Sequence, residues 1–200
     1  MKLRYSSLLL ALCMAFYLLP ITATAEPSFQ ARWSNAGEEG EIPVNWTSSG
    51  SLADAVNAAN NSITGIMYIQ LLSDVNTAGL TFTASNASIL DLNGRTLSCD
   101  SDNTVLHEGS GKLTITDSSS EKKGKVTNQS TDSDTIFLYG SSLVIEGGTV
   151  ENTGVGFAIN NCSFGSVEIT GDISNPLFPA LLALVALCGM VITVRTKKRA

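Results

Sequence analysis

Carboxylates are the side chains of this sequence that are best suited to catalysis or to metal binding. Enzymes that cleave acidic polysaccharides use convergent carboxylates, either to hold calcium or to move protons. Asp100 and Asp102 lie two positions apart at a predicted turn and are the best calcium candidates, although solvated turn acids are the more ordinary interpretation. His107, the only histidine, has the chemistry of a general base, but no partner for it can be named and we expect a surface histidine.

Two further groups of side chains have the chemistry of binding. Tyr139 and Phe164 are the aromatic residues that fall outside the expected core positions of the second half of the chain, and exposed aromatics are typical of glycan-binding faces. Lys122, Lys123 and Lys125 form a small basic spot. We interpret this spot as a charged loop tip, with contact to an anionic wall polymer as the alternative hypothesis.

A repeat between residues 88 and 175 must position these side chains. Each unit has an apolar-x-apolar pair, a glycine and then a small or amide residue at a fixed offset; the pairs, aligned in this order, are Leu90/Leu92, Leu113/Ile115, Leu143/Ile145 and Val167/Ile169. A turn of about 23 residues cannot bury its apolar side alone, but stacked turns give each residue a like neighbour about 4.8 Å away. The repeat therefore predicts a parallel β-helix.

The offset position defines a predicted structural corner ladder, made of Cys99, Asn128, Asn152 and Asn175. Asparagine tolerates left-handed backbone and its amide can stack on the asparagine of the next turn, so Cys99 is expected to be a small corner residue and not a nucleophile. In this alignment the outward acids Asp91 and Glu168 lie three rungs apart, about 14 Å, which is too far for a catalytic pair. We therefore name no catalytic residue and expect no cofactor.

The predicted fold class is all-β, a right-handed parallel β-helix of about four to five coils over residues 51–175. A short amphipathic helix at residues 51–60 is expected to cover its first coil, with Ser51 as N-cap and Asp54 at the capping-box position. Residues 26–50 form a lead-in segment with a strand around Ile42 to Thr47. An antiparallel sandwich or jelly roll is the alternative fold.

The two ends of the chain have membrane-related patterns. Residues 1–25 combine a basic start, an apolar run and Ala23-Thr-Ala25, which predicts a cleaved secretory signal peptide; a retained anchor is the alternative. Residues 177–194 contain no charge and are followed by the basic tail 195–200, which predicts a C-terminal transmembrane helix with a cytoplasmic end; a buried core helix is the alternative.

Charge and cysteine content narrow the function classes. Between residues 26 and 175 there are eighteen acidic and six basic side chains, a net charge of −12, which excludes nucleic acid as a partner because a phosphate backbone requires a basic face. Cys99 and Cys162 face the secreted side and lie in different coils at different corners, so we expect two free thiols.

The phrases Asp91-Leu-Asn-Gly-Arg-Thr-Leu97 and Gly147-Gly-Thr-Val-Glu-Asn152 resemble right-handed β-helix modules of the pectate-lyase-like superfamily, as used in adhesin-like surface proteins of Gram-positive bacteria. The C-terminal arrangement resembles a cell-wall sorting signal, but Asn175-Pro-Leu-Phe-Pro179 departs from the cleaved pentapeptide, so a plain membrane anchor is expected in place of wall linkage.

These features together lead us to expect a non-catalytic, single-pass membrane protein with an extracellular β-helix. Its expected role is adhesion or envelope structure, and the expected partners are a glycan or envelope polymer, or a second copy bound through an uncapped last rung. The alternatives are a polysaccharide lyase or glycoside hydrolase, and a glycan-binding module.

Overall fold

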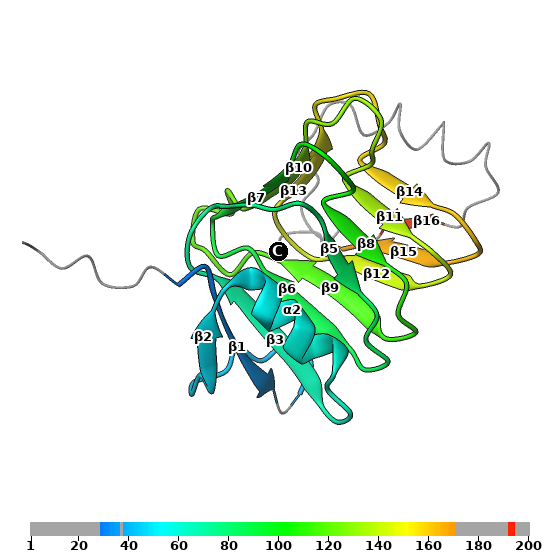
Figure 1. Ribbon diagram of the computed structural model, residues 1–200. Helices are drawn as coiled ribbons and strands as arrows, with labels where there is room; N and C mark the ends of the chain where they lie inside the picture. Colours follow the sequence, from blue (N-terminus) through cyan, green and yellow to red (C-terminus); the bar gives the residue numbers. More distant parts are fainter. Residues whose placement is uncertain (1–28, 37, 171–191, 195–200) are drawn as a thin grey trace, which may run out of the picture.

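The structure, a computed structural model, describes residues 29–36, 38–170 and 192–194, which form a β-solenoid of about four turns with one short helix (Figure 1). Each turn contributes one strand to each of three sheets. Strands of successive turns pair in parallel, which confirms the predicted parallel β-helix and rules out the antiparallel sandwich for these residues.

Three sheets form the walls of the solenoid. Sheet A contains β3 (Ile66–Leu71), β6 (Ser88–Asp91), β9 (Lys112–Thr116), β12 (Ser142–Ile145) and β15 (Ser166–Ile169). Sheet B contains β4 (Val75–Asn76), β7 (Thr96–Cys99), β10 (Lys125–Asn128) and β13 (Thr149–Asn152). Sheet C contains β5 (Leu80–Phe82), β8 (Val105–His107), β11 (Ile136–Leu138) and β14 (Ile159–Asn161).

The interior is a single apolar core that runs along the solenoid axis. Side chains alternate between core and outer face along each strand, so like residues stack from turn to turn. One such column on sheet A consists of Ile69, Leu90, Ile115, Ile145 and Ile169, all buried. Because each rung covers the next, the apolar residues that a single turn leaves exposed are removed from water by stacking.

The register between the second and third turns differs from the predicted alignment. Leu90 pairs with Ile115 and Ser88 with Leu113, so the alignment of Leu90 with Leu113 is wrong by two residues. Leu92 lies past the end of β6, buried at the corner toward sheet B. There, a methyl group built on Gly124 would lie 2.5 Å from Cβ of Leu92, so the third turn has a glycine where the second turn inserts a leucine.

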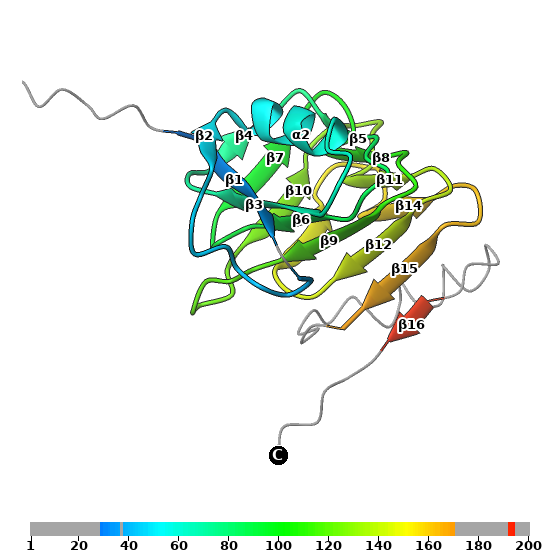
Figure 2. The same cartoon turned by 90° about the horizontal axis from the view of Figure 1, so that it is seen from below.

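The first turn is covered by helix α2 (Leu52–Asn60), as Figure 2 shows. Ser51 Oγ accepts a hydrogen bond from the backbone N–H of Asp54 at 3.1 Å, and the Asp54 carboxylate accepts one from the Ser51 N–H, which confirms the predicted capping box. Leu52, Ala55 and Val56 bury the apolar face of the helix against the core.

The lead-in segment extends sheet A beyond the first turn. β1 (Ala31–Ala36) pairs antiparallel with β3, and β2 (Ser48–Gly50) pairs antiparallel with β1. The predicted strand at Ile42 to Thr47 is wrong, because residues 42–47 form a loop between these strands. Ile42 and Val44 are exposed in that loop, and their alternation therefore does not reflect a half-buried strand.

At the other end, β16 (Ile192–Val194) pairs in parallel with β15. These three residues are the last of the predicted transmembrane span, 177–194, and the structure describes them as a strand. The rest of the predicted span, the signal peptide and Asn175 lie outside the described residues. Within the part of the chain that is described, no helix has the length and apolar content needed to span a membrane. The expectation of an uncovered last rung is wrong for sheet A, since β16 occupies the edge of β15.

Candidate binding surface

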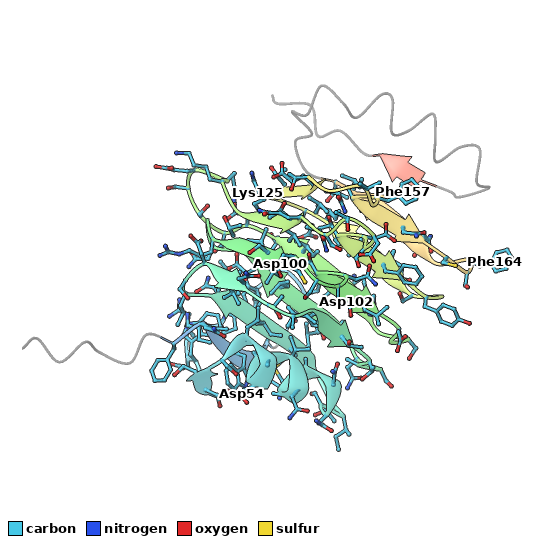
Figure 3. All side chains as sticks on the ribbon, turned by 45° about the horizontal axis from the view of Figure 1, so that its top comes forward. Asp54, Asp100, Asp102, Lys125, Phe157 and Phe164 are labelled. Carbon is cyan, nitrogen blue, oxygen red and sulfur yellow. The ribbon has the colours of Figure 1, made fainter. Side chains whose placement is uncertain are left out.

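Two exposed aromatic side chains lie on adjacent turns at the corner between sheets C and A. Tyr139 follows β11 and is 60% exposed, and Phe164 follows β14 and is fully exposed. The backbone N–H of Cys162 donates to the carbonyl of Leu138 at 2.9 Å, which aligns the two loops on neighbouring rungs. We call Tyr139 and Phe164 the aromatic corner; Figure 3 shows Phe164 projecting away from the body of the solenoid.

The backbone at Phe164 is strained. Ser163 and Phe164 have φ angles of 115° and 57°, in the left-handed region that bulky residues rarely adopt. In the preceding turn a glycine, Gly140 with φ 68°, makes the corresponding bend. The last turn thus combines an unfavourable backbone conformation with a fully exposed phenyl ring, and neither feature contributes to packing of the core.

Further apolar side chains are exposed on the outer face of sheet C and at the end of that sheet opposite to the aromatic corner. Phe137 and Leu106 are paired on the outer face of sheet C, and each is only partly buried. Val155 and Phe157, in the loop between β13 and β14, are 80% and 50% exposed. Phe157 was not among the aromatics predicted to be exposed, but β14 begins two residues later at Ile159 and this ring lies at the surface (Figure 3).

The predicted basic spot is not a free cationic surface. Lys123 pairs with Glu121, and Lys125 pairs with Glu151 of the neighbouring strand at 2.9 Å. The ammonium group of Lys122 donates to the carbonyl of Asp117. These contacts favour the interpretation of the spot as an ordinary charged loop over that of an anion-binding site.

The two predicted calcium ligands do not gather with other ligands. Asp100 and Asp102 are exposed in the loop after β7, and Asp102 Oδ1 accepts a hydrogen bond from the Asn103 N–H at 2.7 Å (Figure 3). Among residues 29–36, 38–170 and 192–194, no three histidine, cysteine, aspartate or glutamate side chains are placed to hold a metal ion. This arrangement is the one expected of solvated turn acids.

The predicted corner ladder brings Cys99, Asn128 and Asn152 into register on sheet B. The asparagines do not, however, play the role that was predicted for them. Asn128 Oδ1 accepts from the Ser130 N–H at 2.7 Å and Asn152 Oδ1 from the Gly154 N–H at 2.9 Å, so each closes an Asx turn. Neither has a positive φ, and neither amide bonds to the next asparagine.

A buried polar network that sequence reasoning missed lies on the outer face of sheet A. Asp91 is fully buried and accepts four hydrogen bonds, from the Tyr68 hydroxyl, the Gln70 amide and the N–H groups of Asn93 and Ser118, all between 2.7 and 3.0 Å. Burial is the main cause that raises the pKa of Tyr68 well above its usual value, followed by the charge of Asp91.

The lead-in segment closes over this network. Arg32 of β1 donates from Nε to Gln70 Oε1 at 2.8 Å, and its guanidinium lies 4.1 Å from the ring centre of Trp46. Trp46 in turn packs edge-on against Tyr68. The only signal in the sequence was an arginine and a tryptophan far from the repeat, which could not be assigned to Asp91 without the antiparallel pairing of β1 and β3.

A second buried carboxylate, Asp117, holds the corner between sheets A and B. It accepts hydrogen bonds from the N–H groups of Gly94, Ser119 and Gly124, at 2.8, 3.0 and 2.6 Å. Burial by itself raises the pKa of Asp117, but the hydrogen bonds from Ser119, Gly124 and Gly94 outweigh it, and the net pKa lies below the usual value. The carboxylates of Asp91 and Asp117 are therefore occupied by hydrogen bonds within the scaffold.

His107 points into the core, which corrects the expectation of a surface histidine. Its Nε2 lies 3.0 Å from the Gly111 carbonyl and its Nδ1 3.3 Å from the Phe82 carbonyl. Burial lowers the pKa of His107, and the contacts with the Phe82, Gly111 and Ser142 backbone offset only part of that effect. Two turns later Asn161 makes the same contact, from Nδ2 to the Gly165 carbonyl at 2.6 Å, so both residues are corner braces.

The fold and the surface together define the class of this protein as a short, acidic β-solenoid with an exposed aromatic corner. No protein-family model matches the chain, and neither a curated protein nor a solved structure matches it.

Proposed function

We propose that the protein is a non-catalytic cell-surface protein that displays its β-solenoid outside the membrane and binds through the aromatic corner, in adhesion or in envelope structure. The observation that carries the proposal is Phe164, whose ring is fully exposed on a strained backbone. A strained backbone and an exposed aromatic ring both cost stability, and neither is offset here by packing in the core, which is a reason to infer a binding role. Tyr139 on the preceding turn gives the same surface a second ring.

The placement at the cell surface rests on sequence patterns. Residues 1–25 have the pattern of a secretory signal, and the uncharged stretch from Leu177 with its basic tail has the pattern of a membrane anchor. The resemblance of residues 47–175 to pectate-lyase-like and adhesin-like modules is a further reason to propose a solenoid displayed by a Gram-positive cell. A polysaccharide-cleaving enzyme is the alternative, and the commitment of Asp91 and Asp117 to hydrogen bonds disfavours it.

The test is retention of the purified full-length protein on an array of glycans and host-matrix proteins. We expect saturable retention that Phe164→Gly and Tyr139→Ser reduce, whereas Ile63→Ser, a change of an equally exposed residue beyond helix α2, leaves it intact. Phe164→Gly should leave the free energy of unfolding unchanged or raise it, because glycine adopts positive φ freely.

Retention that is indifferent to both corner variants would refute the aromatic corner as the binding surface. Depolymerisation of an acidic polysaccharide by the same preparation would favour the enzyme alternative.

A further inference from the structure

The segment that provides the aromatic corner is acidic in sequence, and the neighbouring turn adds one exposed acid, Glu108, and one lysine, Lys112, which is paired with Glu39. Residues 126–170, which provide the corner and the last two turns, include five acids and no lysine, arginine or histidine; the acids are Asp132, Asp134, Glu146, Glu151 and Glu168. Of these, Glu151 is paired with Lys125. A field of one sign attracts partners of the opposite charge and repels partners of the same charge.

The faces of aromatic rings also favour cations. A lysine or arginine side chain placed over a phenyl or phenol ring is attracted by the ring quadrupole, and its methylene stem packs on apolar surface. Tyr139 and Phe164 provide two such faces on adjacent rungs, and Phe137 and Leu106 extend apolar surface along sheet C. The corner thus combines apolar contact for the stem of a basic side chain with a negative field for its head group.

We propose that the ligand of the aromatic corner is a cationic polypeptide segment, rich in lysine or arginine, on another protein. The inference rests on the proposed function, since it names the partner of the same surface. Charge complementarity favours a basic partner over an anionic polymer, which the acidic turns would repel. Encounter with a basic segment is accelerated by the same charges.

The experiment measures binding of a fluorescein-labelled peptide of alternating lysine and glycine to the full-length protein by fluorescence anisotropy. Matched peptides replace lysine with glutamine or with glutamate. We expect the lysine peptide to bind most tightly, with affinity that falls as ionic strength rises from about 0.05 to about 0.5 M. Phe164→Gly should weaken it roughly 5-fold, in line with loss of one cation-π contact and its packing, and Ile63→Ser should leave it unchanged.

Equal affinity for the lysine and glutamine peptides, or lysine binding that is unaffected by Phe164→Gly, would overturn the inference. Preference for neutral glycans on the array, still sensitive to Phe164→Gly, would also overturn it while leaving the proposed function intact. If neither peptides nor array ligands respond to the corner variants, the proposed function fails as well. The Phe164→Gly variant is suited to these comparisons because the change relieves backbone strain.

Discussion

The hydroxyl of Tyr68 donates a 3.0 Å hydrogen bond to the carboxylate of Asp91 on the outer face of sheet A, where both side chains are buried. This contact joins the first turn of the solenoid to the second. Through Gln70 and Arg32 the same network reaches the lead-in strand β1, so residues outside the repeat are tied to its first two rungs.

We predict that Asp91→Asn lowers the free energy of unfolding by about 2–4 kcal/mol, because an amide NH2 would then face N–H donors in a buried site. Tyr68→Phe should lower it by about 1–2 kcal/mol, since one donor is removed and three remain. Denaturant unfolding followed by circular dichroism measures both. A smaller loss in Asp91→Asn than in Tyr68→Phe would contradict the central place of Asp91.

Asp117 should contribute to acid stability. Its pKa is lower in the folded protein than the ordinary value near 3.9, so its contribution is complete above about pH 4 and is lost as pH falls through the lowered pKa. The isosteric Asp117→Asn variant lacks this titration. Its free energy of unfolding, measured at a series of pH values, should therefore fall less steeply in acid than that of the unchanged protein. The same decrease of the free energy of unfolding with falling pH in both proteins would contradict the prediction.

His107 should make the solenoid less stable in mild acid. Because burial lowers its folded pKa, the unfolded chain binds the proton more readily, and stability falls as pH decreases below the unfolded pKa of about 6.5 toward the folded pKa. His107→Asn installs the side chain that Asn161 uses two turns later. The variant should lose the pH dependence between about pH 7 and 5 while staying folded at pH 7. An unchanged slope would assign that dependence to other groups.

The stacked core gives a position-specific prediction on β12. Leu143 is buried between Leu113 and Val167, whereas its neighbour Val144 faces outward beside Glu168. Leu143→Lys should lower the free energy of unfolding by more than about 4 kcal/mol and unfold the protein, because an unpaired charge would enter the core. Val144→Lys should change the free energy of unfolding by no more than about 1 kcal/mol, since the ammonium group of the new lysine reaches solvent and Glu168. Thermal melts of the two variants decide whether the register is right.

The repeat made the solenoid predictable. Apolar pairs and glycines recurring about every 23 residues indicate stacked parallel turns, since the apolar side of one turn has no other means of burial. The capping helix was predictable for a local reason, because Ser51 and Asp54 are only three residues apart and satisfy each other's backbone. The offset that brings Cys99, Asn128 and Asn152 together was likewise visible as a periodicity.

Other features required the assembled molecule. The register of the second and third turns differs by two from the predicted alignment, and Leu92 fills the space beside Gly124, a contact between separate turns that no local pattern encodes. His107 enters the core because strand alternation places it beneath the Gly111 carbonyl, and Asp91 is buried because β1 brings Arg32 and Trp46 over it. The sequence alone thus determined the repeating architecture, through short-range periodicity and burial. Only the tertiary structure decided which polar side chains are consumed in holding the turns together, and that Phe157 is exposed in addition to the predicted Tyr139 and Phe164, because these outcomes depend on neighbours that are distant along the chain.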